Sequence, residues 1–187
     1  MKIKKISKRL NKEKIIILID GWQSFESLFY FIRESVPEEY GYIQYAYTND
    51  TLNSNPIKTK ENFLHLVDVI LNDIKRLKTK KKRSFYMYGQ SLGGLFCMIV
   101  SDKIKIEKIR LIIPGSNLAE AFWHGEGTIE VKNEMVKKYN MTLPKLTKIW
   151  DKISPDHYLK SKSLKTEFNL TISKNDFVIP TKNGKNL

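Results

Sequence analysis

The sequence is poor in residues that cross-link a protein through disulfides or metals. It has one cysteine, Cys97, and three histidines among 187 residues. A single cysteine excludes an internal disulfide framework and suits a reducing compartment. No cluster of histidine, cysteine, aspartate or glutamate has metal-ligand spacing, and neither a phosphate-binding loop nor a dinucleotide fingerprint occurs. We therefore expect no metal and no cofactor.

Long hydrophobic runs are absent as well. The apolar run at residues 15–19 ends at Asp20, and no small-residue cleavage site follows it. That run is too short for the core of a signal peptide or for a membrane span. The sequence therefore predicts a cytoplasmic protein.

Acidic residues are few relative to basic ones. Lysine and arginine number 33 against 20 aspartates and glutamates, a net charge of +13, and much of the excess lies in residues 2–14 and 75–83. Basic runs attract phosphates and anionic membranes. No recognition motif accompanies them, so we expect no nucleic-acid partner and only a weak attraction to anionic membrane surfaces.

The segment with the clearest chemistry is Gly89-Gln90-Ser91-Leu92-Gly93, a G-x-S-x-G motif. Strand-forming residues precede it at 84–88, and a helical pattern begins at Leu92. In this context the motif predicts a nucleophile elbow, in which the serine lies at a sharp, costly turn. Gly89 and Gly93 would let strand and helix approach closely. The alternative is a glycine-rich turn of purely structural importance.

Strand and helix patterns alternate along the chain. Five strands are predicted, at residues 15–19, 42–48, 84–88, 109–113 and 168–172, and residues 1–14 read as a tail. Alternation of this kind predicts an α/β fold, a mostly parallel sheet with helices on both faces. Residues 116–150 lack a strand pattern and predict a small helical cap. We expect one domain over residues 1–187.

The elbow, together with Asp176-Phe177-Val178-Ile179-Pro180 after the last predicted strand, resembles the α/β-hydrolase superfamily of serine esterases, lipases and thioesterases. The resemblance runs from about residue 15 to residue 180. It implies Ser91 as nucleophile, Asp176 as the acid, and an oxyanion hole made by the backbone N–H groups of Trp22 and Leu92. The implied reaction is hydrolysis of a small-molecule carboxylic ester or thioester through an acyl-serine.

The histidine of the expected triad is missing from its usual place. Eleven residues follow Asp176, and none is histidine. A crossover with its helix takes about 10–12 residues before another strand begins, so we expect a chain truncated before the catalytic histidine. His124 and His157 remain as candidate bases.

Two consequences stay open at this point. Without its base, the chain is expected to be nearly inactive, and the competing interpretation is a non-catalytic hydrolase-fold module that binds an apolar ligand or partner. A sheet that lacks its terminal strand has an unpaired edge, which predicts self-association.

Overall fold

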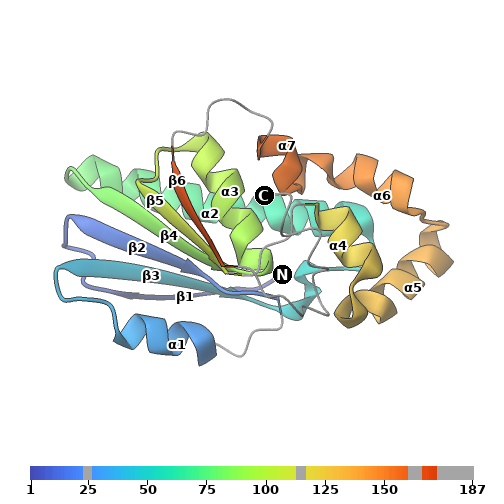
Figure 1. Cartoon of the computed structure of the whole chain (residues 1–187), viewed down its shortest axis with the longest axis horizontal. Helices are drawn as coiled ribbons and strands as arrows, with labels where there is room; N and C mark the ends of the chain where they lie inside the picture. The colour runs from blue at the N-terminus through green and yellow to red at the C-terminus, as the bar shows by residue number, and fades with distance from the viewer. Residues whose placement is uncertain (23–26, 113–116, 160–165, 172–187) are drawn as a thin grey trace.

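The computed structural model describes residues 1–22, 27–112, 117–159 and 166–171 (Figure 1). Within them, six strands form one sheet in the order β1-β3-β2-β4-β5-β6. Their bounds are β1 Ile3–Lys8, β2 Lys14–Ile19, β3 Tyr40–Tyr47, β4 Ser84–Gln90, β5 Lys108–Ile112 and β6 Glu167–Thr171. Only β1 is antiparallel to its neighbour, so the prediction of a mostly parallel α/β sheet is confirmed.

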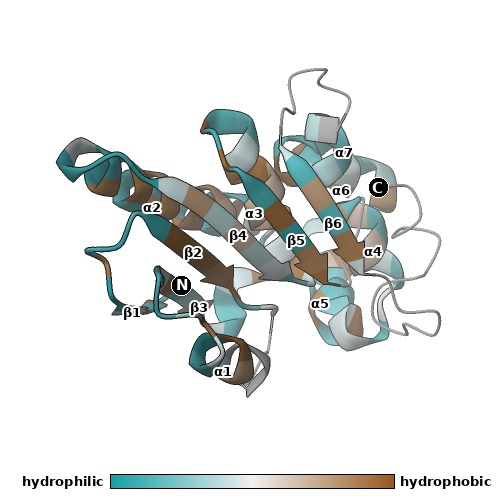
Figure 2. Ribbon diagram, turned by 60° about the vertical axis from the view of Figure 1, so that its left-hand side comes forward, coloured by the Kyte–Doolittle hydropathy of each residue, from teal (hydrophilic) through white to brown (hydrophobic). Residues whose placement is uncertain are grey.

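Helices cover both faces of the sheet, as predicted. On one face, α2 (Pro56–Lys80) and α3 (Leu92–Lys103) pack over the larger core, and on the other face lies α1 (Ser27–Glu34) (Figure 1). The central strand β2 is buried along residues 15–19 and hydrophobic along most of its length (Figure 2). A strand buried on both faces needs such a continuous run rather than alternation.

The prediction that residues 1–14 are a tail is wrong, because Ile3–Lys8 form the edge strand β1. The segment shows no alternation because only Ile3 and Ile6 are partly buried. They lie an odd number of residues apart and pack against opposite faces of the sheet. The remaining positions, mostly lysines, suit an edge strand. The sheet therefore has six strands rather than five.

The described residues between β5 and β6 are mostly helical. They contain α4 (Leu118–His124), α5 (Ile129–Tyr139), α6 (Leu143–Trp150) and α7 (Pro155–Leu159). Phe122 of α4 and Trp150 of α6 are both buried, with ring centroids 5.0 Å apart. The Trp150 indole also donates a hydrogen bond to the carbonyl of Pro56 at 2.9 Å, which ties these helices to α2.

Asp73, on α2, joins three elements near the β1 edge. Its carboxylate accepts hydrogen bonds from Lys5 of β1 at 2.9 Å, from the Tyr45 hydroxyl of β3 at 2.7 Å and from Arg76 at 2.9 Å. Burial acts to raise the pKa of Asp73. The hydrogen bonds from Lys5 and Tyr45 and the charges of Lys5 and Arg76 outweigh burial and hold that pKa below its ordinary value. The edge strand is therefore anchored by an ionised carboxylate.

We expect Asp73→Asn to lower the free energy of unfolding by roughly 2 kcal/mol at pH 7, because the amide loses charge-assisted bonds and brings a donor next to donors. The folded-state pKa of Asp73 lies below the unfolded value of about 3.9, so the carboxylate stabilises above that pH and loses its effect as pH falls further. Urea unfolding at pH 7 and pH 3 should show a smaller acid-induced loss in the variant than in the wild type. Asp68→Asn, an exposed position on the same helix, should keep the wild-type pH dependence.

Candidate active site

Ser91 lies at the turn between β4 and α3. Its backbone has φ 48° and ψ −119°, a conformation that is costly for any residue with a side chain. The turn is fixed on both sides, because the Ser91 N–H donates to the carbonyl of Ile112 at 2.8 Å and the Gly94 N–H donates to the Ser91 carbonyl at 2.9 Å. The sharp turn therefore holds a half-buried serine where the strand ends and the helix begins.

The two motif glycines mark close approaches of backbone. A Cβ on Gly93 would lie 2.1 Å from the carbonyl oxygen of Ile19, and a Cβ on Gly89 would lie 2.5 Å from the carbonyl oxygen of Gly93. Real Cβ atoms do not approach backbone oxygens so closely. Strand β2, strand β4 and helix α3 can meet as they do only because both positions lack side chains.

The loop after β2 lies against the elbow. A Cβ on Gly21 would be 3.4 Å from the Cβ of Ser91, so the residues before Trp22 are in van der Waals range of the serine. The Trp22 indole donates a hydrogen bond to the Asn49 carbonyl at 2.8 Å, which ties that side chain to the short turn Asn49–Thr51. Leu92 is the first residue of α3, and an N–H at that position has no intrahelical partner. Both predicted oxyanion donors thus belong to segments that adjoin Ser91.

A polar chain runs from α1 to the end of β2. Asp20 is buried at 1% exposure and accepts hydrogen bonds from the Gln44 amide at 3.0 and 3.2 Å. Gln44 in turn accepts a hydrogen bond from Arg33 of α1 at 2.8 Å. The Asp20 carboxylate therefore lies beside the loop of the oxyanion donor, but it is bound to partners on the α1 face. Gln44 and Arg33 were not among the predicted site residues, and the one local signal for them is a glutamine within an otherwise hydrophobic strand.

The candidate acid, Asp176, lies outside the described residues. Two aspartates of the described helical segment could also be considered for the acid, but both contact other groups. Asp156 accepts a hydrogen bond from the Asn117 amide at 2.9 Å, and Asp151 lies 2.9 Å from His157 Nδ1. The structure therefore leaves the assignment of Asp176 a prediction.

The two candidate bases lie on different helices. His157 belongs to α7, and its neighbour Tyr158 has a raised pKa, caused by burial and then by the charges of Asp102 and Asp151. Asp102 is eleven residues beyond Ser91 on α3, about 16 Å along the helix axis at 1.5 Å per residue. His157 is therefore held near the end of α3 that is remote from the elbow.

His124 is the last residue of α4, which lies beyond the carboxyl ends of the strands (Figure 1). Its Nε2 is 3.4 Å from a carboxylate oxygen of Glu120, and its side chain is 50% exposed. The carboxyl ends of parallel strands are where ligands bind in open α/β sheets. Of the two histidines, His124 is thus the one on the Ser91 side of the sheet.

Other chemistry is limited in the described parts of the chain. Burial raises the pKa of Cys97, so this core thiol stays protonated and unreactive. The described residues hold no group of three or more histidine, cysteine, aspartate or glutamate side chains that could bind a metal ion. Among the helices that the structure describes, none is both long and apolar enough to cross a membrane.

The strained backbone of Ser91 also predicts how substitutions at that position change the stability of the fold. Glycine tolerates a positive φ and alanine does not, so Ser91→Gly should be about 1 kcal/mol more stable to urea than Ser91→Ala. The comparison isolates backbone strain because neither variant keeps the hydroxyl. Equal stabilities would show that the turn is not strained at Ser91. The same pair at Ser101, in the body of α3, should show the reverse order, since glycine weakens a helix interior.

Known proteins match this chain in structure, although no family model or curated protein matches its sequence. Among solved structures, an acylaminoacyl peptidase from Pyrococcus horikoshii matches with a TM-score of 0.65 at 14% identity, over 98% of this chain and 31% of that one. A lipase/esterase from Lactobacillus plantarum matches with a TM-score of 0.59 at 10% identity, over 99% and 82% of the two chains.

A third match is MGS-M2, an α/β-hydrolase enzyme from a Medee basin deep-sea metagenome library. Its TM-score is 0.57 at 13% identity, over 98% of this chain and 80% of that one. Identities this low show the fold alone. The chain has the α/β-hydrolase fold, as the elbow and its context predicted.

Proposed function

We propose that this chain is a serine hydrolase that cleaves carboxylic esters or thioesters through an acyl-serine at Ser91. The observation that carries the proposal is the backbone of Ser91, held at φ 48° at the start of α3 with the Gly21 loop against it. A strained serine at such a turn has no structural advantage over glycine, which favours a role for its hydroxyl.

The proposed reaction has two halves. A base takes the proton from Ser91 Oγ as the oxygen attacks the carbonyl carbon, and the backbone N–H groups of Leu92 and Trp22 donate to the oxyanion that forms. The base then gives the proton to the leaving alkoxide or thiolate as the acyl bond breaks. Water, deprotonated by the same base, releases the acid and restores the serine. Asp176 would orient the base.

The name of one structural match, a lipase/esterase, supports ester hydrolysis in a coarse way. We propose a small-molecule acyl ester or thioester as substrate, with no nucleic acid involved. Phe122 and Trp150 are buried against each other, so they pack the helices rather than line an acyl site. Trp123 is partly buried, with Lys132 over its ring at 5.9 Å, and remains a candidate contact for the acyl group.

Fluorophosphonate labelling tests the proposal directly, because the reagent reacts with activated serines and not with ordinary ones. We expect a single labelled peptide that contains Ser91, and no label in Ser91→Ala. Label on another serine would refute the site. No label on the folded wild-type chain would show that no base within these 187 residues activates Ser91, as the missing triad histidine predicts, and would favour the non-catalytic binding module.

The two candidate bases give a paired prediction. His157→Ala should leave kcat within about twofold, because α7 packs near the remote end of α3. His124→Ala should lower kcat by roughly 10⁴-fold or more if His124 takes the proton, since members of a triad act as a unit. The pH profile of kcat/KM should lose its histidine limb only in the His124 variant. Unchanged rates in both variants would exclude the described histidines as the base.

The compartment and assembly are proposals as well. We infer a cytoplasmic protein from the single, buried Cys97. The basic runs favour weak attraction to anionic membranes, and the edge strands β1 and β6 are the places where self-association through the sheet would occur.

A further inference from the structure

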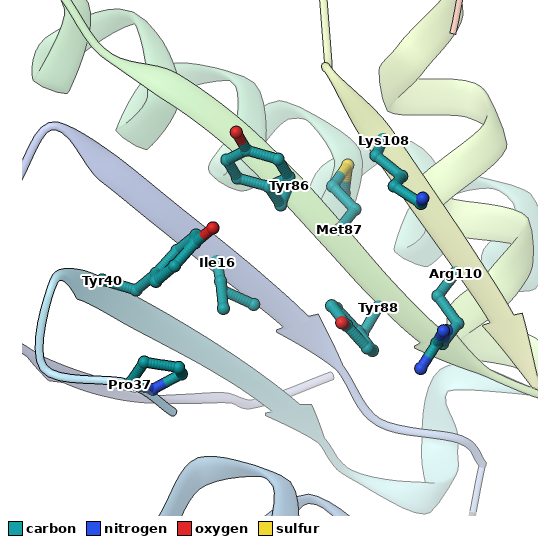
Figure 3. A pocket seen from close by; sticks show the side chains of 8 residues that line it. All are labelled: Ile16, Pro37, Tyr40, Tyr86, Met87, Tyr88, Lys108 and Arg110. Carbon is teal, nitrogen blue, oxygen red and sulfur yellow. The ribbon is translucent and has the colours of Figure 1, made fainter. Parts of the chain in front are cut away.

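A groove lies beside α1 on the sheet face opposite α2 and α3. It consists of two adjoining hollows of about 350 and 380 Å³ that share Ile16, Pro37, Tyr88 and Arg110. Figure 3 shows the floor of the first hollow, where side chains of β2, β3, β4 and β5 converge. Its middle is apolar, and Tyr40, Tyr86, Lys108 and Arg110 stand around it.

Beside the groove, the part of this sheet face that α1 leaves uncovered is about as wide as one helix. Ile32 and Val36, in and after α1, pack on the part of the face made by β2 and β3. In the described part of the chain no helix packs on the same face of β4, β5 and β6. Neighbouring strands are about 4.8 Å apart, so three strands leave a strip about 10 Å wide, close to the diameter of an α-helix.

The polar groups of the groove are cations and hydroxyl donors. Arg110 is exposed, with its guanidinium 5.7 Å from the centre of the Tyr88 ring. Lys14 does not line the groove itself, but its ammonium lies 5.1 Å from the centre of the ring of Tyr40, which does. Lys108 is paired with Glu167 at 2.7 Å. Of these three cations, Lys108 thus already has a carboxylate partner, on β6. A ligand with carboxylates beside an apolar surface would complement the groove.

We propose that this groove binds an amphipathic helix of another protein, with its apolar side against the sheet and with aspartates or glutamates along its flanks. Such docking in a groove is a common way to recognise a helix. Arg110 and Lys14 would meet the flanking carboxylates, and Ile16 and the tyrosine rings would meet the apolar side chains. The helix of the partner would thus cover the part of this sheet face that α1 leaves uncovered.

Three other occupants of the groove fit it less well than an acidic helix: a second copy of the chain, the chain's own C-terminal residues and a membrane surface. A second copy of the chain has a net charge of +13 and does not supply the acidic flanks that would complement this groove, whereas pairing of edge strands does not use the groove. Residues 172–187 carry three lysines against one aspartate and contain Pro180 and Gly184, which disfavour a helix. A flat membrane surface does not reach into a concave groove.

The proposal is tested with the full chain and a synthetic peptide of about 18 residues, long enough to form a helix. The peptide has leucines along one face, glutamates on the flanks and a fluorescein label; a matched peptide has lysines in place of the glutamates. Fluorescence anisotropy should show saturable binding of the glutamate peptide only. Arg110→Glu should weaken it roughly tenfold or more, because an attraction becomes a repulsion. Lys137→Glu, on the exposed side of α5, should leave affinity within about twofold.

Several results would overturn the proposed docking site or replace its proposed partner. Failure of the glutamate peptide to bind, or equal weakening by Lys137→Glu, would overturn the groove as a docking site. A tenfold gain in peptide affinity on Phe177→Ser would show that the chain's own C-terminal residues occupy it. A dimer in sedimentation, or binding to phosphatidylglycerol vesicles, that Arg110→Glu abolishes would replace the proposed partner with a second copy or a membrane. An unchanged melting temperature of Arg110→Glu excludes misfolding as the cause.

Discussion

Gly93→Ala is expected to destabilise the protein by more than about 3 kcal/mol, enough to prevent stable folding of many small domains. The added Cβ would lie 2.1 Å from the carbonyl oxygen of Ile19 and 2.7 Å from that of Asp20. Both atoms are backbone, so relief requires β2 and α3 to move apart rather than a side chain to rotate. An alanine in a helix is otherwise favourable by about 1 kcal/mol, so the expected sign is opposite to that of helix propensity.

Urea unfolding measures this loss, and Gly127→Ala is its matched control. A Cβ on Gly127 would have no atom within 4 Å, so that variant should stay within about 1 kcal/mol of the wild type. A stable Gly93→Ala would mean that the close approach of β2 and α3 is not required. The presence of glycine at position 93 of the elbow would then have no steric explanation.

The parallel part of the fold could be predicted because its signals are local. Residues 15–19 form an uninterrupted apolar run, and such a run is what a strand buried on both faces requires. Strand β1 gave no such signal. It pairs with β3 on one side only and is anchored by the contact between Lys5 and Asp73, which are 68 residues apart. No pattern within residues 1–14 contains that information.

The first residue of helix α2 also could not be predicted from residue type alone. By residue type, both Asn55 and Thr59 are suited to cap the start of α2. The cap is Asn55, whose side chain accepts hydrogen bonds from Ile57 N at 3.0 Å and Lys58 N at 3.2 Å. Pro56 favours this earlier start because proline suits the first position of a helix. The Thr59 hydroxyl instead donates to the Asn53 carbonyl at 3.0 Å and closes the preceding loop.

One part of the candidate site is made by contiguous residues, and another part by residues that are far apart in the sequence. The elbow could be recognised because strand, serine, glycines and helix are contiguous in the chain. The chain of hydrogen bonds from Arg33 through Gln44 to Asp20 joins three separate elements, and nothing in their spacing indicates it. His157 was a candidate by residue type alone, whereas the packing of α7 beside the far end of α3 depends on the whole helical segment.

The largest effect on activity is expected from Ser91→Ala. If Ser91 is the nucleophile, the variant should lower kcat for 4-nitrophenyl esters by about 10³- to 10⁶-fold, since the remaining oxyanion donors and binding give only about 10³–10⁴ over water. KM should rise toward the dissociation constant of the ester, because an acyl-enzyme that accumulates before slow deacylation lowers KM in the wild type and cannot form in the variant. A burst of nitrophenol equal to the enzyme concentration should precede steady turnover in the wild type and be absent from the variant.

Ser101→Ala is the matched control, because Ser101 lies in the same helix and its hydroxyl donates to the Met98 carbonyl at 2.9 Å. It should leave the burst and kcat unchanged. Equal, slow rates in the wild type, Ser91→Ala and Ser101→Ala would show that this chain does not hydrolyse esters. The hydrolase fold would then serve to bind a ligand, and the strain at Ser91 would need another explanation. A Ser91-dependent burst without steady turnover would place the defect in deacylation, the step in which the base must activate water.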